Sequence, residues 1–298
     1  MIEIKKCSKS FGSVKAVDKV SLEIGEREVF GLVGSNGAGK STLLRMAAGI
    51  LKPDEGEIQI DGENIYDNEK AKACIFYIPD DSYFPADYTP RDIADFYRCY
   101  YPKFDVQRFS KFLRQFHMDD KKRISTFSKG MRKQLLVLLG VSAGTKYLLC
   151  DETFDGLDPV MRRQIWSIIM SEVAENQMTV LVSSHNLREL EDVCDHVGIM
   201  HQGTIMIERS LSDLQGSVSK IQVACQNGVP KLPEEFEVLH MSNTGRVYTL
   251  IVKGDPEDAK KALASADPAI VDVLPLTLEE IFIYEMGGAD YEVKDILF

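Results

Sequence analysis

The chain has 298 residues, of which 44% are hydrophobic and 27% are charged, and its formal net charge is −11. These proportions are those of a folded globular protein with room for one large and one smaller domain. An acidic chain binds the phosphates of nucleic acid poorly, so we expect no nucleic acid as the main partner. No apolar run reaches the roughly 18 residues of a membrane span, and the N-terminus lacks the apolar core of a signal peptide. The six cysteines lack paired spacing, which suits a reducing compartment, so we expect a cytoplasmic protein.

The first 80 residues have the alternating pattern of strands around a single strand–loop–helix unit. A helix is expected from Lys40, with Gly49 placed to end it. Short apolar runs predict strands at residues 2–4, 20–24, 29–33 and 58–60. This part of the chain is therefore predicted to form antiparallel strands that wrap around the strand–loop–helix unit.

From residue 81 the pattern becomes helical. Thr89 followed by Pro90 marks the start of a first helix. Asp105 is expected to cap a second helix, whose apolar residues recur at helical spacing. Ser128 is expected to cap a third helix that ends near Leu139. These helices predict a helical subdomain at about residues 82–145.

After this region, strands and helices alternate again. Strands are predicted at 147–150 and 179–183, helices at 159–175 and up to about Val193, and a hairpin at 200–207 with its turn at Gln202-Gly203. Strands separated by helices of this length indicate a parallel sheet. Beyond residue 216 the pattern predicts strands at 221–224, 247–252 and 270–274, with helices at 256–264 and 277–286. We expect a first domain over residues 1–216 and a small α+β domain over 217–298.

One segment carries the strongest chemical signal. It consists of Gly34, Ser35, Asn36, Gly37, Ala38, Gly39, Lys40 and Ser41, and it matches G-x-x-x-x-G-K-[ST] between a predicted strand and a predicted helix. The glycines let backbone N–H groups surround phosphate oxygens, and the positive end of the helix adds to the field. Lys40 is expected to reach the β- and γ-phosphates, Ser41 to bind Mg²⁺, and Thr42 to assist at the α-phosphate.

A second signal is the apolar strand at residues 147–150, which ends in Asp151 and Glu152. Two adjacent carboxylates at the end of a buried strand are electrostatically costly unless a cation neutralises them. With a magnesium–nucleotide site predicted in the same chain, Asp151 becomes a partner of Mg²⁺. Glu152 can then polarise the attacking water as the catalytic base.

The segment between these two signals narrows the class. Residues 127–131 read Phe-Ser-Lys-Gly-Met and open the predicted helix that precedes Asp151. They resemble the signature motif of the ABC-transporter ATPases, usually Leu-Ser-Gly-Gly-Gln. Residues 156–159, Gly-Leu-Asp-Pro, resemble the D-loop of that family, and His185 at a strand end resembles its switch histidine.

Two further positions extend the resemblance, which covers residues 1–210. Phe11 stands where the family has an aromatic residue that stacks on adenine, and Val17 lies nearby in the sequence. The resemblance implies an α/β P-loop NTPase of ABC type. It has a RecA-like core, an antiparallel β layer and a helical subdomain, to which the C-terminal α+β domain is added here.

The resemblance also implies a mechanism. Two such ATPase subunits, identical or different, face each other head to tail and hold each ATP between the phosphate loop of one and the signature motif of the other. Ser128 and Gly130 would then contact the γ-phosphate bound by the partner, and Asp158 would lie at the dimer seam while also capping a helix. His185 would contact the γ-phosphate. ATP and Mg²⁺ are the implied cofactors.

Two departures from the family pattern stand out. Lys129 and Met131 replace a glycine and the glutamine of the signature motif. Asp80 stands where the family has a glutamine that touches Mg²⁺ and senses the membrane subunit. Asp80 either faces the nucleotide as a metal ligand or turns away to cap its own loop, and the sequence leaves both open. These variations resemble the ATPases of bacterial ABC-2-type exporters related to antibiotic and bacteriocin resistance.

The resemblance implies an ATP-hydrolysing subunit that powers a separate membrane permease, most simply an exporter, from the inner face of the cell membrane. A non-transport ABC ATPase acting on DNA or the ribosome is an alternative, although this chain lacks the second ATPase unit or long coiled-coil insertion usual there. An ATP-dependent regulatory module with weak turnover is another, suggested by Asp80 and Lys129. That second alternative is opposed by four intact residues: Lys40, Asp151, Glu152 and His185.

Overall fold

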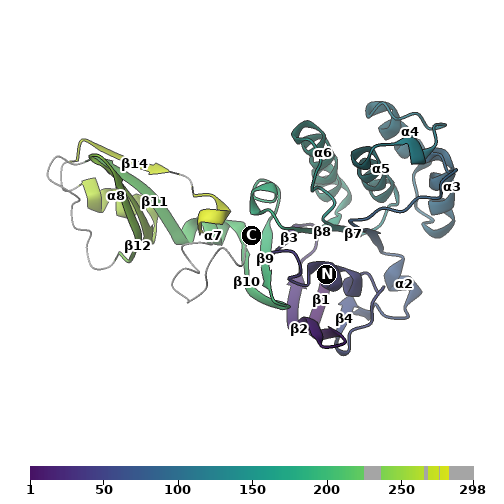
Figure 1. Ribbon diagram of the computed structural model, residues 1–298, viewed down its shortest axis with the longest axis horizontal. Coiled ribbons are helices and arrows are strands. Elements are labelled where there is room, and N and C mark those ends of the chain that lie inside the picture. Colours follow the sequence, from purple (N-terminus) through teal and green to yellow (C-terminus); the bar gives the residue numbers. More distant parts are fainter. Residues whose placement is uncertain (225–235, 265–267, 275, 282–298) are drawn as a thin grey trace. The chain divides into compact units, whose positions relative to one another are not determined.

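The computed structural model describes residues 1–224, 236–264, 268–274 and 276–281, and the chain divides into two compact units (Figure 1). The first unit contains residues 1–186 and 193–208, and the second contains residues 187–192 and those from 209 onward. The domain boundary expected at residue 216 falls within helix α7 (Leu211–Ser217), shortly after this division.

An antiparallel sheet with the strand order β2-β1-β4-β5 begins the first unit. Its strands are β1 (Ile2–Phe11), β2 (Val14–Ile24), β4 (Glu55–Ile60) and β5 (Glu63–Asn64). Alternate apolar side chains of these strands point inward, and they share one core with α1 (Lys40–Ala47) and with residues of a second sheet. The antiparallel layer expected from the sequence is therefore confirmed.

The second sheet has six strands in the order β10-β9-β3-β8-β7-β6. They are β3 (Val29–Val33), β6 (Ile75–Ile78), β7 (Tyr147–Asp151), β8 (Thr179–Ser184), β9 (His196–His201) and β10 (Thr204–Ser210). Strand β3 pairs in parallel with β8 and β9, and β7 pairs in parallel with β6 and β8. The carboxyl ends of these parallel strands therefore meet at one edge of the sheet, where ligands bind in open α/β folds.

Four helices lie on the other side of this sheet from the antiparallel layer (Figure 1). They are α3 (Pro90–Tyr100), α4 (Val106–Gln115), α5 (Lys129–Ser142) and α6 (Pro159–Asn176). Short helices occur at α2 (Glu69–Lys72), η1 (Ile124–Thr126) and η2 (Leu187–Glu189). The expected caps are confirmed, because Thr89, Asp105 and Ser128 each accept a backbone N–H of the helix that follows.

The second unit contains a four-stranded sheet with the order β12-β13-β11-β14. Its strands are β11 (Val218–Ala224), β12 (Val238–Thr244), β13 (Val247–Lys253) and β14 (Ile270–Leu274), joined by α8 (Pro256–Ala264). Its core consists of Ile221, Val223, Leu250, Val252, Ala259 and Leu263. Of the helix expected at 277–286, residues 278–281 are helical and the remainder lies outside the described residues.

The sequence-based prediction differs from the structure at several elements, and it lacked strand β6 and the short helix α2. The helix expected to end near Val193 is a short 3₁₀ turn at Leu187–Glu189. Strand β12 was not predicted, because most of its side chains are exposed and its apolar residues do not alternate. None of the helices within the described ranges combines the length and apolar character needed to cross a bilayer.

Candidate nucleotide site

Three loops meet at the carboxyl edge of the six-stranded sheet. The segment 34–41 follows β3, residues 152–155 follow β7, and residues 185–186 follow β8. Strand register brings them together, because Val33 lies opposite Ser184 and Asp151 lies opposite Ser183. Side chains distant in the sequence therefore share one site.

The loop at residues 34–41 needs glycine at two positions for steric reasons. A Cβ on Gly39 would lie 2.2 Å from the carbonyl oxygen of Ala16, and Gly39 has a φ of +108°. A Cβ on Gly34 would lie 2.1 Å from the carbonyl oxygen of Met200. Both contacts are far shorter than van der Waals separation and involve backbone atoms, so the loop can pack this closely only with glycine at both positions.

Lys40, the first residue of α1, is almost fully buried. Its ammonium group donates to the carbonyl oxygens of Gly34 at 2.7 Å and Ser35 at 3.1 Å. It also lies 3.2 Å from Oε1 of Glu152, with which it forms an ion pair. A cation held inside a loop of backbone N–H groups is the arrangement that binds the phosphates of a nucleotide.

Asp151 is fully buried, and three hydroxyl groups satisfy its carboxylate. Ser41 and Ser183 each donate to Oδ1 at 2.8 Å, and the hydroxyl of Tyr77 on β6 donates to Oδ2 at 3.1 Å. Burial and the charge of Asp151 raise the pKa of Tyr77 to about 12, so the phenol stays protonated and remains a donor. The Ser41 hydroxyl and the Asp151 carboxylate fit Mg²⁺, which takes hard oxygen ligands.

Glu152 is held by its backbone as well as by its side chain. Its N–H donates to the hydroxyl of Ser183 at 3.1 Å, and its carbonyl oxygen accepts from the ammonium of Lys133 at 2.7 Å. Its φ of +45° is in the left-handed region, which a residue with a Cβ rarely adopts. The side chain is partly exposed and points to Lys40, so its carboxylate lies beside the phosphate loop.

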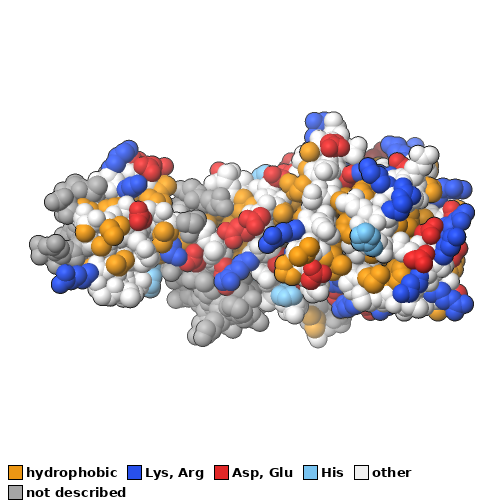
Figure 2. Space-filling model, turned by 90° about the horizontal axis from the view of Figure 1, so that it is seen from above, with side chains coloured by type: hydrophobic (Ala, Val, Ile, Leu, Met, Phe, Trp, Pro, Cys, Tyr) orange, Lys and Arg blue, Asp and Glu red, His pale blue; other side chains and the backbone are white. Residues whose placement is uncertain are grey.

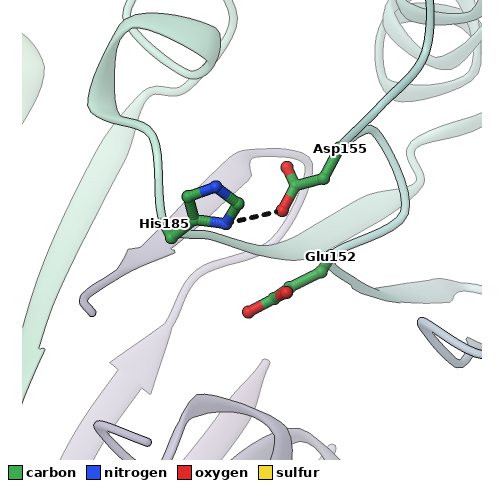
Figure 3. A group of neighbouring side chains, drawn as sticks. All are labelled: Glu152, Asp155 and His185. Atoms are coloured by element: carbon green, nitrogen blue, oxygen red, sulfur yellow. Dashed lines mark ion pairs between the residues drawn. The ribbon is translucent and has the colours of Figure 1, made fainter. Parts of the chain in front are cut away.

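Glu152, Asp155 and His185 form a cluster at the same edge (Figure 3). Nδ1 of His185 lies 2.9 Å from Oδ2 of Asp155, while the hydroxyl of Ser184 donates to Oδ1 of Asp155 at 3.3 Å. Asp155 thus orients the half-exposed imidazole. The ligand atoms of the three clustered residues lie within 4.8 Å of one another, so Glu152 and His185 border the same space.

The remaining predicted residues lie in different surroundings. Phe11 is half exposed at the end of β1, whereas Val17 is fully buried in the core beside the antiparallel sheet. Ser128 and Asp158 cap α5 and α6, and Asp158 accepts from two backbone N–H groups. Asp80 is 47% exposed, and its Oδ1 accepts from the ammonium of Lys133 at 3.1 Å.

Sequence reasoning missed four contributors to the site: Tyr77, Lys133, Asp155 and Ser183. Tyr77 and Asp151 are 74 residues apart, and Lys133 and Asp80 are 53 apart. The strand order β8-β7-β6 brings Tyr77 beside Asp151, and the packing of α5 against β6 brings Lys133 to Asp80. Asp155 alone had a local signal, as an acid three residues after Glu152 in the loop that follows a buried strand.

Comparison with known proteins gives consistent matches. A family described as "ABC transporter" matches residues 17–155. The ABC transporter ATP-binding protein YtrB of Bacillus subtilis is 33% identical over 288 residues, which cover 97% of this chain and 99% of that protein. The bacitracin transport ATP-binding protein BcrA of Bacillus licheniformis is 30% identical over 308 residues, which cover 97% and 98% of the two chains.

Solved structures agree with these matches. One, the ATP-binding subunit of an ABC transporter, superposes with a TM-score of 0.67 at 25% identity and covers 72% of this chain and 92% of its own. The dimeric cassette MJ0796 with ADP and Pi has a TM-score of 0.63 at 20% identity, covering 71% of this chain and 99% of its own, and shows the fold alone. The fold class expected from the sequence is confirmed.

Proposed function

This chain belongs to the ABC transporter ATP-binding proteins, and we propose that it uses ATP hydrolysis to power a separate membrane-spanning permease, most simply an exporter. The observation that carries the proposal is the convergence of Lys40, Asp151 and Glu152 at one edge of the sheet. Similarity over 97% of the chain to a protein named for bacitracin transport supports a role in transport.

The contacts of Lys40 suggest how the site responds to ATP. In the structure its ammonium neutralises the carboxylate of Glu152. Phosphate oxygens of the nucleotide carry more negative charge and would draw Lys40 toward them. Glu152 then loses its cationic partner and becomes free to accept a proton from the attacking water. Binding of the nucleotide would thereby expose the base.

The other residues of the site would hold the metal ion and orient the groups around the nucleotide. Ser41 and Asp151 would hold Mg²⁺, which neutralises charge on the phosphates when it is bound. Asp151 keeps its position through Ser183 and Tyr77. His185, aligned by Asp155, would contact the γ-phosphate. The half-exposed Phe11 remains the proposed adenine contact, whereas the side chain of Val17 is fully buried in the core and has no surface for a ligand.

A dimer is part of the proposal. The chain carries one phosphate loop and one signature motif, so a complete sandwich requires a second ATPase subunit. Ser128 and Gly130 stand at the N-terminus of α5, where the helix presents free N–H groups to an anion. Asp158 would lie at the seam. Attached to its permease, the subunit would be peripheral on the inner face of the membrane.

The proposal is tested by measuring phosphate release from Mg-ATP with the purified chain. Lys40→Ala is the matched variant and should abolish release. Reconstitution with the permease in proteoliposomes should then give ATP-dependent movement of a substrate. ATP turnover without binding to a permease would favour a non-transport ABC ATPase. Absence of turnover in both the unmodified chain and Lys40→Ala would favour a regulatory module.

A further inference from the structure

Lys133 on α5 is a buried lysine that no motif predicted. Its side chain is only 3% exposed, although it lies five residues after the cap Ser128. Removing an ammonium ion from water is costly unless hydrogen bonds and an opposite charge compensate. The surroundings of Lys133 therefore have to supply both.

The ammonium group has three acceptors. It donates to Oδ1 of Asp80 at 3.1 Å, to the carbonyl oxygen of Glu152 at 2.7 Å and to the carbonyl oxygen of Asp155 at 3.3 Å. An ammonium has three N–H groups, so each acceptor can take one. Asp80 supplies the only negative charge among the three acceptors and acts as the counter-ion.

The two carbonyl groups bracket the catalytic loop. Glu152 begins the loop and Asp155 aligns His185, so Lys133 fixes the backbone at both ends of the segment that carries the base. Glu152 also has a left-handed backbone, which persists only where surrounding contacts impose it. Lys133 provides one such contact.

We propose that Lys133 is a positioning residue for ATP hydrolysis, and that its ion pair with Asp80 links the segment after β6 to the loop of Glu152 and Asp155. The inference rests on the proposed function. It explains the aspartate at position 80 as the counter-ion of a buried lysine, and it gives that carboxylate a role other than metal binding. A displacement of Asp80 would remove the counter-ion of Lys133 and so disturb the loop.

The test measures kcat and KM for Mg-ATP in Lys133→Gln, Asp80→Asn and the double variant. Each single change should lower kcat, by about 10–100-fold for Lys133→Gln, because small displacements of a base are costly. KM should change little, since Lys40 and the phosphate loop are untouched. In the double variant kcat should equal that of Lys133→Gln, because the carboxylate acts through the lysine.

Exposed neighbours serve as controls: Lys111→Gln on α4 and Asp81→Asn should both keep the kcat of the unmodified chain. Wild-type kcat in Lys133→Gln, or losses that multiply in the double variant, would overturn the inference. If thermal unfolding shows that Lys133→Gln does not fold, Asp80→Asn decides alone, because its side chain is half exposed and an unchanged kcat there refutes the link. Inactivity of the unmodified chain would instead count against the proposed function.

Discussion

The two units of the chain differ in where they keep their charges. The first unit buries Lys40, Lys133, Asp151 and Glu172, and every one of them has a charged or hydroxyl partner. In the described residues of the second unit, the buried side chains are apolar apart from Ser219. Ion pairs there, such as Lys220 with Glu280, are at least partly exposed.

This difference shows that the interior of the first unit supports a chemical site, whereas the interior of the second unit serves packing alone. Buried charge seldom improves stability over an apolar core, so it indicates a site where chemistry needs it. Three of the four buried charges in the first unit belong to the nucleotide site or its supports. The core of the second unit is apolar and serves to stabilise its fold, and its described residues carry no phosphate-binding motif.

Figure 2 shows that acidic and basic side chains are interspersed on the visible face, so no single sign of charge dominates that face of the described residues.

The largest expected effect tests the site itself. Glu152→Gln removes the proposed base but keeps the shape of the side chain, so turnover should fall by about 10²–10⁴-fold. ATP binding should persist, and a dimer with bound ATP should accumulate. Phosphate release and light scattering in Mg-ATP measure the two effects. Turnover close to that of the unmodified chain would remove Glu152 from its proposed role.

The next effect tests whether the second unit only packs. Leu250→Ala empties part of its core and should destabilise that unit by about 2–5 kcal/mol. ATP turnover by the first unit should be unchanged. Denaturant unfolding and phosphate release report the two quantities, with the exposed Met241→Ala on β12 as the control. A parallel loss of turnover would contradict the separation of roles.

A smaller effect concerns the support of the buried carboxylate. Tyr77→Phe leaves Oδ2 of Asp151 without its donor and should cost about 1–3 kcal/mol of unfolding free energy. Denaturant titration measures it. The exposed Tyr83→Phe, which removes a hydroxyl from the surface, should have no effect. Equal stabilities for both variants would mean that Asp151 does not depend on this bond.

The smallest effect concerns charge at the surface of the first unit. Burial opposes ionisation of Asp61, but hydrogen bonds from Lys146 and Tyr147 outweigh it and lower the pKa of Asp61 to about 2. Because the folded pKa lies below the ordinary value of about 3.9, the stabilisation is complete above that pH and is lost as pH falls through 2.

Asp61 is more than one third exposed, so screening limits this stabilisation to about 1 kcal/mol. Asp61→Asn should therefore lower the unfolding free energy at pH 6, and this effect should shrink as pH falls toward 2. Unfolding curves at several pH values measure the difference between the two chains. A difference that does not change with pH would show that the carboxylate charge is not its source.

Structural features that depend on neighbouring residues in the sequence were predicted well. Features that depend on contacts between distant residues were not predicted. Helix starts at Thr89 and Asp105 were predicted because a cap acts on the N–H groups just after it. The turn at Leu187–Glu189 was wrongly predicted as part of a helix. Asp195 exchanges two hydrogen bonds with Val29, so the chain must return to the sheet within a few residues. Periodicity in the sequence does not contain that requirement.

The site divides in the same way. The phosphate loop, Asp151 and Glu152 were predicted because each belongs to a recognisable pattern of consecutive residues. Asp80 was noticed only as a departure, because it lies in the loop after β6 while its partner Lys133 lies on helix α5. An ion pair between residues so far apart follows from the packing of α5 against β6, which the sequence did not reveal.

Because Glu152 has a left-handed backbone, protein stability and ATPase activity favour different residues at this position. A residue with a Cβ in this conformation costs roughly 1–2 kcal/mol, a cost from which glycine is exempt. Glu152→Gly would thus relax the chain at the position where it removes the proposed base. Selection for a more stable protein and selection for a working ATPase would favour different residues there, so thermal stability alone is a misleading guide when variants of this loop are chosen.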